Sequence, residues 1–158
     1  MSSRVGVAPR DEQSAAAAAA VIRASRSSGG ESAGARQYSH NTAYGVGKAA
    51  LDKMTADMAV ELRPRGVSVV SVWPGLVRTE LVDAAVRRAG NDRSEIELPG
   101  EGRFDVSGAE SPRFVGRAVT ALATDPAVRD RSGSAVSTSD LAHRYGFTDV
   151  NGALPAGA

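Results

Sequence analysis

The sequence Tyr44-Gly45-Val46-Gly47-Lys48 opens an amphipathic stretch that runs to about residue 62. On a helix, side chains four residues apart lie one above the other, so the phenol and the ammonium of this stretch share one face. Their backbone positions are then separated by about 6 Å along the helix axis. An ordinary phenol, whose pKa is about 10, is a poor base at neutral pH, but a nearby ammonium stabilises its ionised form. The pair therefore predicts a proton-transfer device near the start of a helix.

The residues that follow this helix predict a buried parallel strand. Arg63-Pro64-Arg65-Gly66 ends the helix, because proline disfavours helical backbone in the preceding residue and glycine readily forms a turn. Residues 67–73 are rich in β-branched side chains and almost continuously apolar, as in a strand buried on both faces of a sheet. Pro74-Gly75 ends the strand. Helix, turn and buried strand form half of a doubly wound α/β unit, in which ligands bind at the carboxyl ends of the strands, here at residues 74–79.

The rest of the chain is expected to surround that strand with further elements. A serine followed by proline at Ser111-Pro112 predicts a helix start, and Asp125-Pro126 predicts its end after about Thr124. The other expected elements are a short helix at 80–88, a long loop at 89–108, a short strand at 132–137 and a turn or helical turn at 140–146.

The amino-terminal residues differ in composition from the rest. Six consecutive alanines at 15–20 can form a short helix, because alanine has the highest helix propensity. We expect residues 1–30 to be a loosely ordered leader rich in alanine and serine. The folded domain is then expected at residues 31–152, followed by a loose tail at 153–158.

Composition excludes several classes of function. The chain has 158 residues and a net charge of +1, which suits one domain and gives no electrostatic reason to bind nucleic acid or an anionic membrane. It has no cysteine and two histidines, so we expect neither a disulfide nor a metal site. The longest apolar run, residues 15–22, is too short to span a bilayer. We therefore expect a cytoplasmic protein without nucleic-acid, membrane or metal partners.

These motifs together resemble the short-chain dehydrogenase/reductase family. The resemblance rests on the Tyr-x-x-x-Lys pair at 44–48, then a helix, then a buried strand that leads into Trp73-Pro74-Gly75-Leu76-Val77-Arg78-Thr79-Glu80. Residues 121–126, 132–133 and 140–146 resemble one branch of that family. The resemblance covers about residues 31–152, and it implies an incomplete Rossmann-like, doubly wound parallel sheet that lacks the amino-terminal strands.

The resemblance also implies roles for individual residues. Tyr44 matches the family's general acid/base, and Lys48 matches the lysine that holds the ribose hydroxyls of the nicotinamide nucleotide and lowers the pKa of the tyrosine. The resemblance implies that both residues are catalytic and also contact the cofactor. Ser32, twelve residues before Tyr44, matches the serine that orients the substrate, with Ser28 as the weaker alternative. The positions that match residues near the nicotinamide carboxamide are Pro74, Gly75, Val77 and Thr79.

Several of these residues also have a purely structural interpretation. Tyr44 and Lys48 can belong to the partly exposed surface of an amphipathic helix. Pro74 and Gly75 can simply end the strand, and Thr79 can cap the helix that follows. Their geometry must separate the two interpretations.

The function implied by the resemblance is hydride transfer to or from a small alcohol or carbonyl, with either NAD or NADP as cofactor. Family members begin with a strand and a glycine-rich turn for the cofactor pyrophosphate, and neither that turn nor the family's asparagine precedes Ser32. We therefore expect the carboxyl-terminal half of such an enzyme, weak or inactive alone. The alternative is a non-catalytic fragment or pseudoenzyme that only folds or associates. In either case, helix 44–62 is the expected surface for a homo-oligomer.

Overall fold

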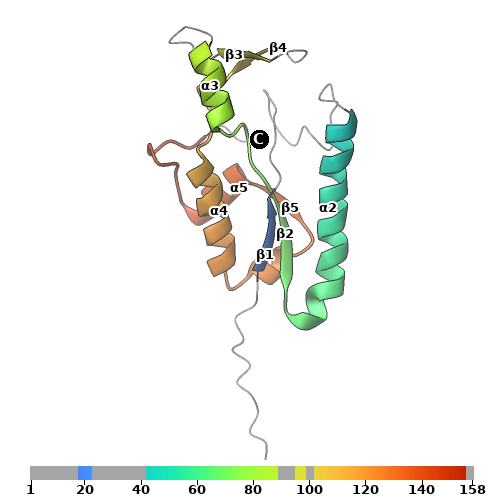
Figure 1. The fold of residues 1–158 in the computed structure, drawn as a ribbon. Helices are drawn as coiled ribbons and strands as arrows, with labels where there is room; N and C mark the ends of the chain where they lie inside the picture. Colours follow the sequence, from blue (N-terminus) through green and yellow to red (C-terminus); the bar gives the residue numbers. More distant parts are fainter. Residues whose placement is uncertain (1–17, 23–41, 89–94, 99–101, 156–158) are drawn as a thin grey trace, which may run out of the picture.

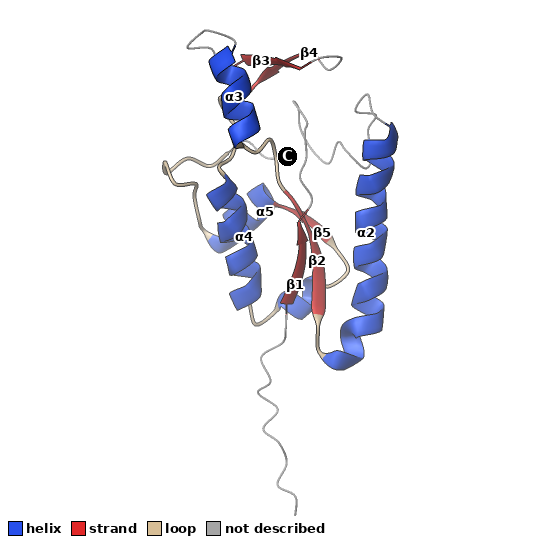
Figure 2. Ribbon diagram, in the orientation of Figure 1, coloured by secondary structure: helices blue, strands red, loops and turns tan. Residues whose placement is uncertain are grey.

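The computed structural model of the protein describes residues 18–22, 42–88, 95–98 and 102–155. Within those residues, a parallel sheet has the strand order β1–β2–β5. Its strands are β1 (Ala18–Ile22), β2 (Ser68–Trp73) and β5 (Ala135–Ser137). Figure 1 shows helices on both sides of this sheet, and Figure 2 distinguishes the helices, strands and loops by colour. The arrangement confirms the predicted α/β, partial Rossmann-like fold.

The register makes β2 the central strand. Ser68 to Val72 pair with β1, and Ser71 to Trp73 pair with β5. The expectation of a helix in the alanine run is wrong where the structure describes that run, because residues 18–20 belong to β1. Alanine favours a helix locally, but pairing with β2 satisfies a row of backbone hydrogen-bonding groups and overrides that preference. The division of the chain at residue 30 remains a prediction.

Helix α2 (Thr42–Leu62) covers one face of the sheet and runs antiparallel to β2. A single 3-10 turn, η1 (Arg63–Arg65), follows it. Gly66 then reverses the chain with a φ of 71°, a left-handed conformation that glycine adopts at little cost. The predicted start, end and strand connection of this helix are confirmed. Among the described residues, neither α2 nor any other helix has the length and hydrophobicity needed to cross a membrane.

The opposite face of the sheet carries the hydrophobic core. Helix α4 (Pro112–Thr124) and helix α5 (Thr138–Tyr145) pack there, with the 3-10 turn η2 (Val128–Arg131) between them in the sequence. Ser111 caps α4 by accepting a hydrogen bond from the Phe114 backbone N–H, as the Ser-Pro pair predicts. The buried core cluster consists of Val70, Val72, Ala118, Leu122, Val128 and Leu141.

A smaller unit lies beyond the carboxyl end of β2 (Figure 1). Helix α3 (Glu80–Arg88) leads to an antiparallel pair, β3 (Glu95–Leu98) and β4 (Gly102–Asp105). The expected loop at 89–108 is therefore wrong at these two strands. The alternation Glu-Ile-Glu-Leu in β3 has the period of a half-buried strand, and Ile96 is buried. Glycines and a proline close by obscured that signal.

Candidate active site

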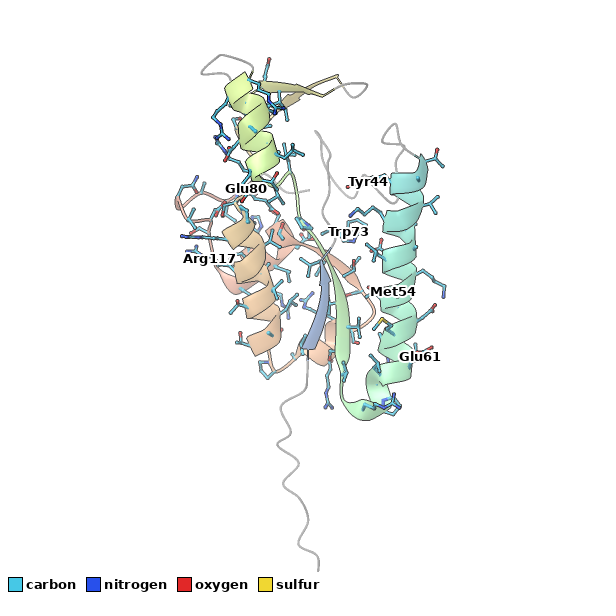
Figure 3. The ribbon with its side chains drawn as sticks, viewed as in Figure 1. Tyr44, Met54, Glu61, Trp73, Glu80 and Arg117 are labelled. Atoms are coloured by element: carbon cyan, nitrogen blue, oxygen red, sulfur yellow. The ribbon has the colours of Figure 1, made fainter. Side chains whose placement is uncertain are left out.

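Tyr44 and Lys48 meet on one face of α2. The Lys48 Nζ lies 5.1 Å from the centroid of the Tyr44 ring, close enough for a cation–π contact. Figure 3 shows Tyr44 at the first turns of α2 and Trp73 at the carboxyl end of β2, both at the same end of the sheet. The pair therefore stands at the edge where parallel α/β sheets bind their ligands.

The same face of α2 continues with Asp52, one turn after Lys48. Its Oδ1 accepts a hydrogen bond of 2.8 Å from the Ser71 hydroxyl and another of 3.0 Å from the Trp73 indole N–H. Both donors lie in the last half of β2. A carboxylate on the helix is thus tied to the strand immediately before the strand enters the segment 74–79.

The segment 74–79 leaves β2 along the carboxyl edge of the sheet. Pro74 and Gly75 are buried, and Val77 is half-buried. Thr79 caps α3 through its hydroxyl, which accepts from Val82 N at 3.4 Å, and its carbonyl accepts the first helical hydrogen bond from Asp83 N at 2.9 Å. The structure thus supports the structural roles of these residues, while their contact with a nicotinamide remains a prediction.

Glu110 fixes this segment from the side. Its backbone N–H donates to the Leu76 carbonyl, and its own carbonyl accepts from Arg78 N, each at 2.8 Å. The Glu110 side chain is only 3% exposed. Its Oε2 accepts a 2.7 Å hydrogen bond from the Thr138 hydroxyl, whereas its Oε1 has no hydrogen-bond partner of good geometry among the described residues. Glu110 thus joins the end of β2 to the start of α5.

The environment of Glu110 favours its protonated form. Burial raises the pKa of Glu110 from 4.5 to about 7, and the negative charge of Asp149 adds to that rise. The Thr138 hydroxyl and the Gly75 backbone N–H act in the opposite direction, because they stabilise the carboxylate. A carboxyl group at the ligand-binding edge of the sheet therefore changes charge near neutral pH.

The sequence and the structure can now be compared residue by residue. Tyr44, Lys48 and the segment 74–79 are brought to one end of the sheet, whereas Ser28 and Ser32 lie outside the described residues. Asp52 and Glu110 were not predicted. The i+4 spacing from Lys48 could have identified Asp52, but no local signal marks Glu110, which is buried by residues distant in the sequence. Within the described ranges, no group of three or more His, Cys, Asp or Glu side chains could hold a metal ion.

Sequence similarity links the chain to known proteins. The family model for short chain dehydrogenase matches residues 10–89. The chain is 49% identical over 121 residues to the mouse dehydrogenase/reductase SDR family member 1, and 46% identical to its human counterpart. Each alignment covers 77% of this chain and 38% of the relative. The short-chain reductase protein NovJ of Streptomyces niveus is 38% identical over 65 residues, which is 41% of this chain and 25% of NovJ. The chain thus spans little more than a third of the member 1 proteins.

Proposed function

Because the chain belongs to the short-chain dehydrogenase family, we propose that it carries the proton-transfer half of an NAD(P)-dependent oxidoreductase site. The observation that supports this proposal best is the placement of Tyr44 and Lys48 together at the carboxyl edge of the sheet. Membership of the family and of the member 1 branch confirms the resemblance that the motifs predicted. The substrate class that we propose is a small alcohol or carbonyl compound.

The proposed chemistry assigns one step to each residue. The Tyr44 phenol exchanges a proton with the substrate oxygen, and the Lys48 ammonium favours the ionised form of that phenol. Ser32 donates a hydrogen bond to the same substrate oxygen, where negative charge develops. Bound NAD or NADP supplies the hydride chemistry.

The donor groups present are suited to the nicotinamide end of such a cofactor. The Lys48 ammonium offers three N–H donors, which match ribose hydroxyls. The segment Pro74 to Thr79 follows the carboxyl end of β2 at the same end of the sheet, and Glu110 holds that segment in place. Whether NAD or NADP binds is left open in this proposal, and the cytoplasmic location expected from composition stays part of it.

Calorimetric titration with NADH and NADPH tests the cofactor site. We expect the wild-type chain to bind one of them, and Lys48→Ala to weaken that binding by roughly tenfold or more, because a charged hydrogen-bond donor is lost. Lys53→Ala is the matched control, since Lys53 is exposed on the same helix and pairs with Asp57. Equal losses in the two variants, or no binding by the wild type at millimolar cofactor, would contradict the proposal.

Turnover tests the role of Tyr44 separately. A screen of aldehydes, ketones and alcohols with the cofactor that binds should reveal any activity of the chain. Tyr44→Phe should abolish that activity and leave cofactor binding nearly unchanged, because it removes only the phenolic hydroxyl that exchanges the proton. A variant that keeps full turnover would exclude Tyr44 as the acid/base.

A second proposal concerns association. The outer face of α2 exposes Val46 by 63% and Val60 by 69%, two apolar side chains spaced two heptads apart. We propose that this face forms a homo-oligomer contact. The alternative function, a non-catalytic module that only associates, is supported by the same surface.

A further inference from the structure

We propose that Asp52 is a positioning residue, whose carboxylate ties the first half of α2 to the end of β2 and so keeps Tyr44 and Lys48 facing the segment 74–79. For the reaction, this inference rests on the proposed function. The tie itself does not, because it is made within the folded chain.

The geometry of the tie is specific. A single oxygen, Asp52 Oδ1, accepts from both Ser71 and Trp73, which are two residues apart on β2 and therefore point to the same face of the strand. Two donors converging on one acceptor restrict both the rotation of α2 and its height along β2. A shift of one helical residue, about 1.5 Å, would remove at least one of these bonds.

The fully buried side chains of α2 are Thr55 and Ala59, and both lie in its second half. There the helix also approaches the backbone of Gly133, where an added Cβ would lie 3.2 Å from the Ala59 Cβ. Packing therefore fixes the later turns, whereas the turns with Tyr44 and Lys48 lie beyond Asp52, up to about 12 Å further along the axis.

The negative charge of Asp52 also complements the positive charge of Lys48. Lys48 precedes it by one turn on the same face, so the carboxylate and the ammonium attract each other, although the acid-before-base order would be the stronger one at this spacing. The carboxylate thus opposes movement of the ammonium away from the sheet. Asp52 acts on the reaction through Lys48 and Tyr44 rather than by contact with the substrate.

Three variants separate this role from general effects on the helix. Asp52→Ala removes the tie, and Asp52→Asn keeps an oxygen acceptor but removes the charge. Asp57→Ala is the control, because Asp57 is an exposed carboxylate on the same helix that pairs only with Lys53 in the salt bridges and hydrogen bonds described. Peptide-resolved hydrogen exchange measures the protection of residues 44–51 without any cofactor. The fluorescence of Trp73, which is the sole tryptophan of the chain, reports the other end of the tie.

We expect Asp52→Ala to speed exchange in residues 44–51 by about tenfold and to increase acrylamide quenching of Trp73, with the second half of α2 unchanged. Asp52→Asn should stay within about threefold of the wild type, because an amide oxygen still accepts both bonds. Asp57→Ala should change neither signal. The proposal would be overturned if residues 44–51 exchanged at the wild-type rate in Asp52→Ala. It would also be overturned if Asp52→Ala and Asp52→Asn lost equal protection from exchange.

Cofactor titration of the same variants links the tie to the site. Where the wild type binds NADH or NADPH, Asp52→Ala should weaken binding about fivefold and Asp52→Asn less than about twofold. Unchanged binding in Asp52→Ala would overturn the positioning role. If the wild type binds neither nucleotide, the proposed function fails by itself, and the exchange experiment still decides whether Asp52 holds the helix.

Discussion

Gly133 shows how a single residue permits the close approach of α2 to the sheet. Its φ is +89°, a conformation that other residues adopt only with strain, and its backbone N–H donates to the Val69 carbonyl at 2.7 Å. A Cβ at this position would lie 3.2 Å from the Ala59 Cβ. Both the strain and the contact oppose any side chain larger than hydrogen.

Gly133→Ala should therefore lower the free energy of unfolding by about 1–3 kcal/mol, through left-handed strain and displacement of α2. Urea denaturation followed by circular dichroism measures this change. Gly116→Ala is the matched control: Gly116 lies in α4 with nothing within 4 Å of an added Cβ, so alanine should stabilise the helix slightly. If Gly133→Ala were as stable as Gly116→Ala, α2 would not approach Gly133 as closely as described.

At the scale of elements, Glu110 connects the segment after β2 to α5. Its backbone pairs with Leu76 and Arg78, and its buried side chain accepts from Thr138. Because the pKa of Glu110 is raised from 4.5 in the unfolded chain to about 7 in the fold, the folded state holds its proton more tightly. The contribution of this group to stability is fully present below about pH 4.5. It is lost as the pH rises through about 7, where a buried carboxylate forms.

Glu110→Gln should remove this dependence, because the amide is neutral at every pH and its oxygen can still accept from Thr138. We compare the free energy of unfolding of the variant with that of the wild type at each pH. We expect this difference to favour the variant more at pH 8.5 than at pH 5, by roughly 1–3 kcal/mol. Urea denaturation at the two pH values measures this difference. The exposed Glu61 provides a control, since Glu61→Gln should show no such change. If Glu110→Gln changed the free energy of unfolding equally at both pH values, the expected formation of a buried Glu110 carboxylate at high pH would be wrong.

The elements show what the sequence could predict and why. Helices α2 and α4 and strand β2 were predicted to within a residue or two, because they combine regular apolar spacing with proline, glycine or serine at their ends. Strand β1 was missed because alanine favours a helix in isolation, and only the partner strand reverses that preference.

The candidate site divides in the same way. Tyr44, Lys48 and Asp52 follow one another at intervals of four, so the helical period alone places them on one face. Glu110 and Thr138 come together only after β2, α4 and α5 have packed, and a pattern within a short stretch of sequence cannot reveal this. The parts built on one element were therefore predictable, and the parts built between elements were not.

At the scale of the whole molecule, the surface through which we expect two copies of the chain to associate lies mainly on the exposed face of α2. Val46, Met54 and Val60 are each more than 40% exposed along one helix. Burial of apolar side chains on a second copy would remove this surface from water. We predict that the chain self-associates in solution, which sedimentation velocity over a range of concentrations can measure.

The double variant Val46→Glu, Val60→Glu should shift the population towards monomer, because burying two carboxylates at the contact is costly. Leu81→Glu on α3 is the control, since Leu81 is 62% exposed but lies on another element. A wild-type chain that remains monomeric at all concentrations, with a sharp cooperative thermal transition, would refute the predicted association.

The parallel register of the sheet also constrains how the chain can fold as the ribosome makes it. Ala18 to Ile22 pair with Ser68 to Val72, so β1 is translated well before its partner. In contrast, α2 and β2 are neighbours in sequence and can pack against each other as soon as both have emerged. We therefore expect the nascent chain to assemble its Tyr44–Lys48 helix on β2 first, while β1 remains unpaired until that unit can receive it.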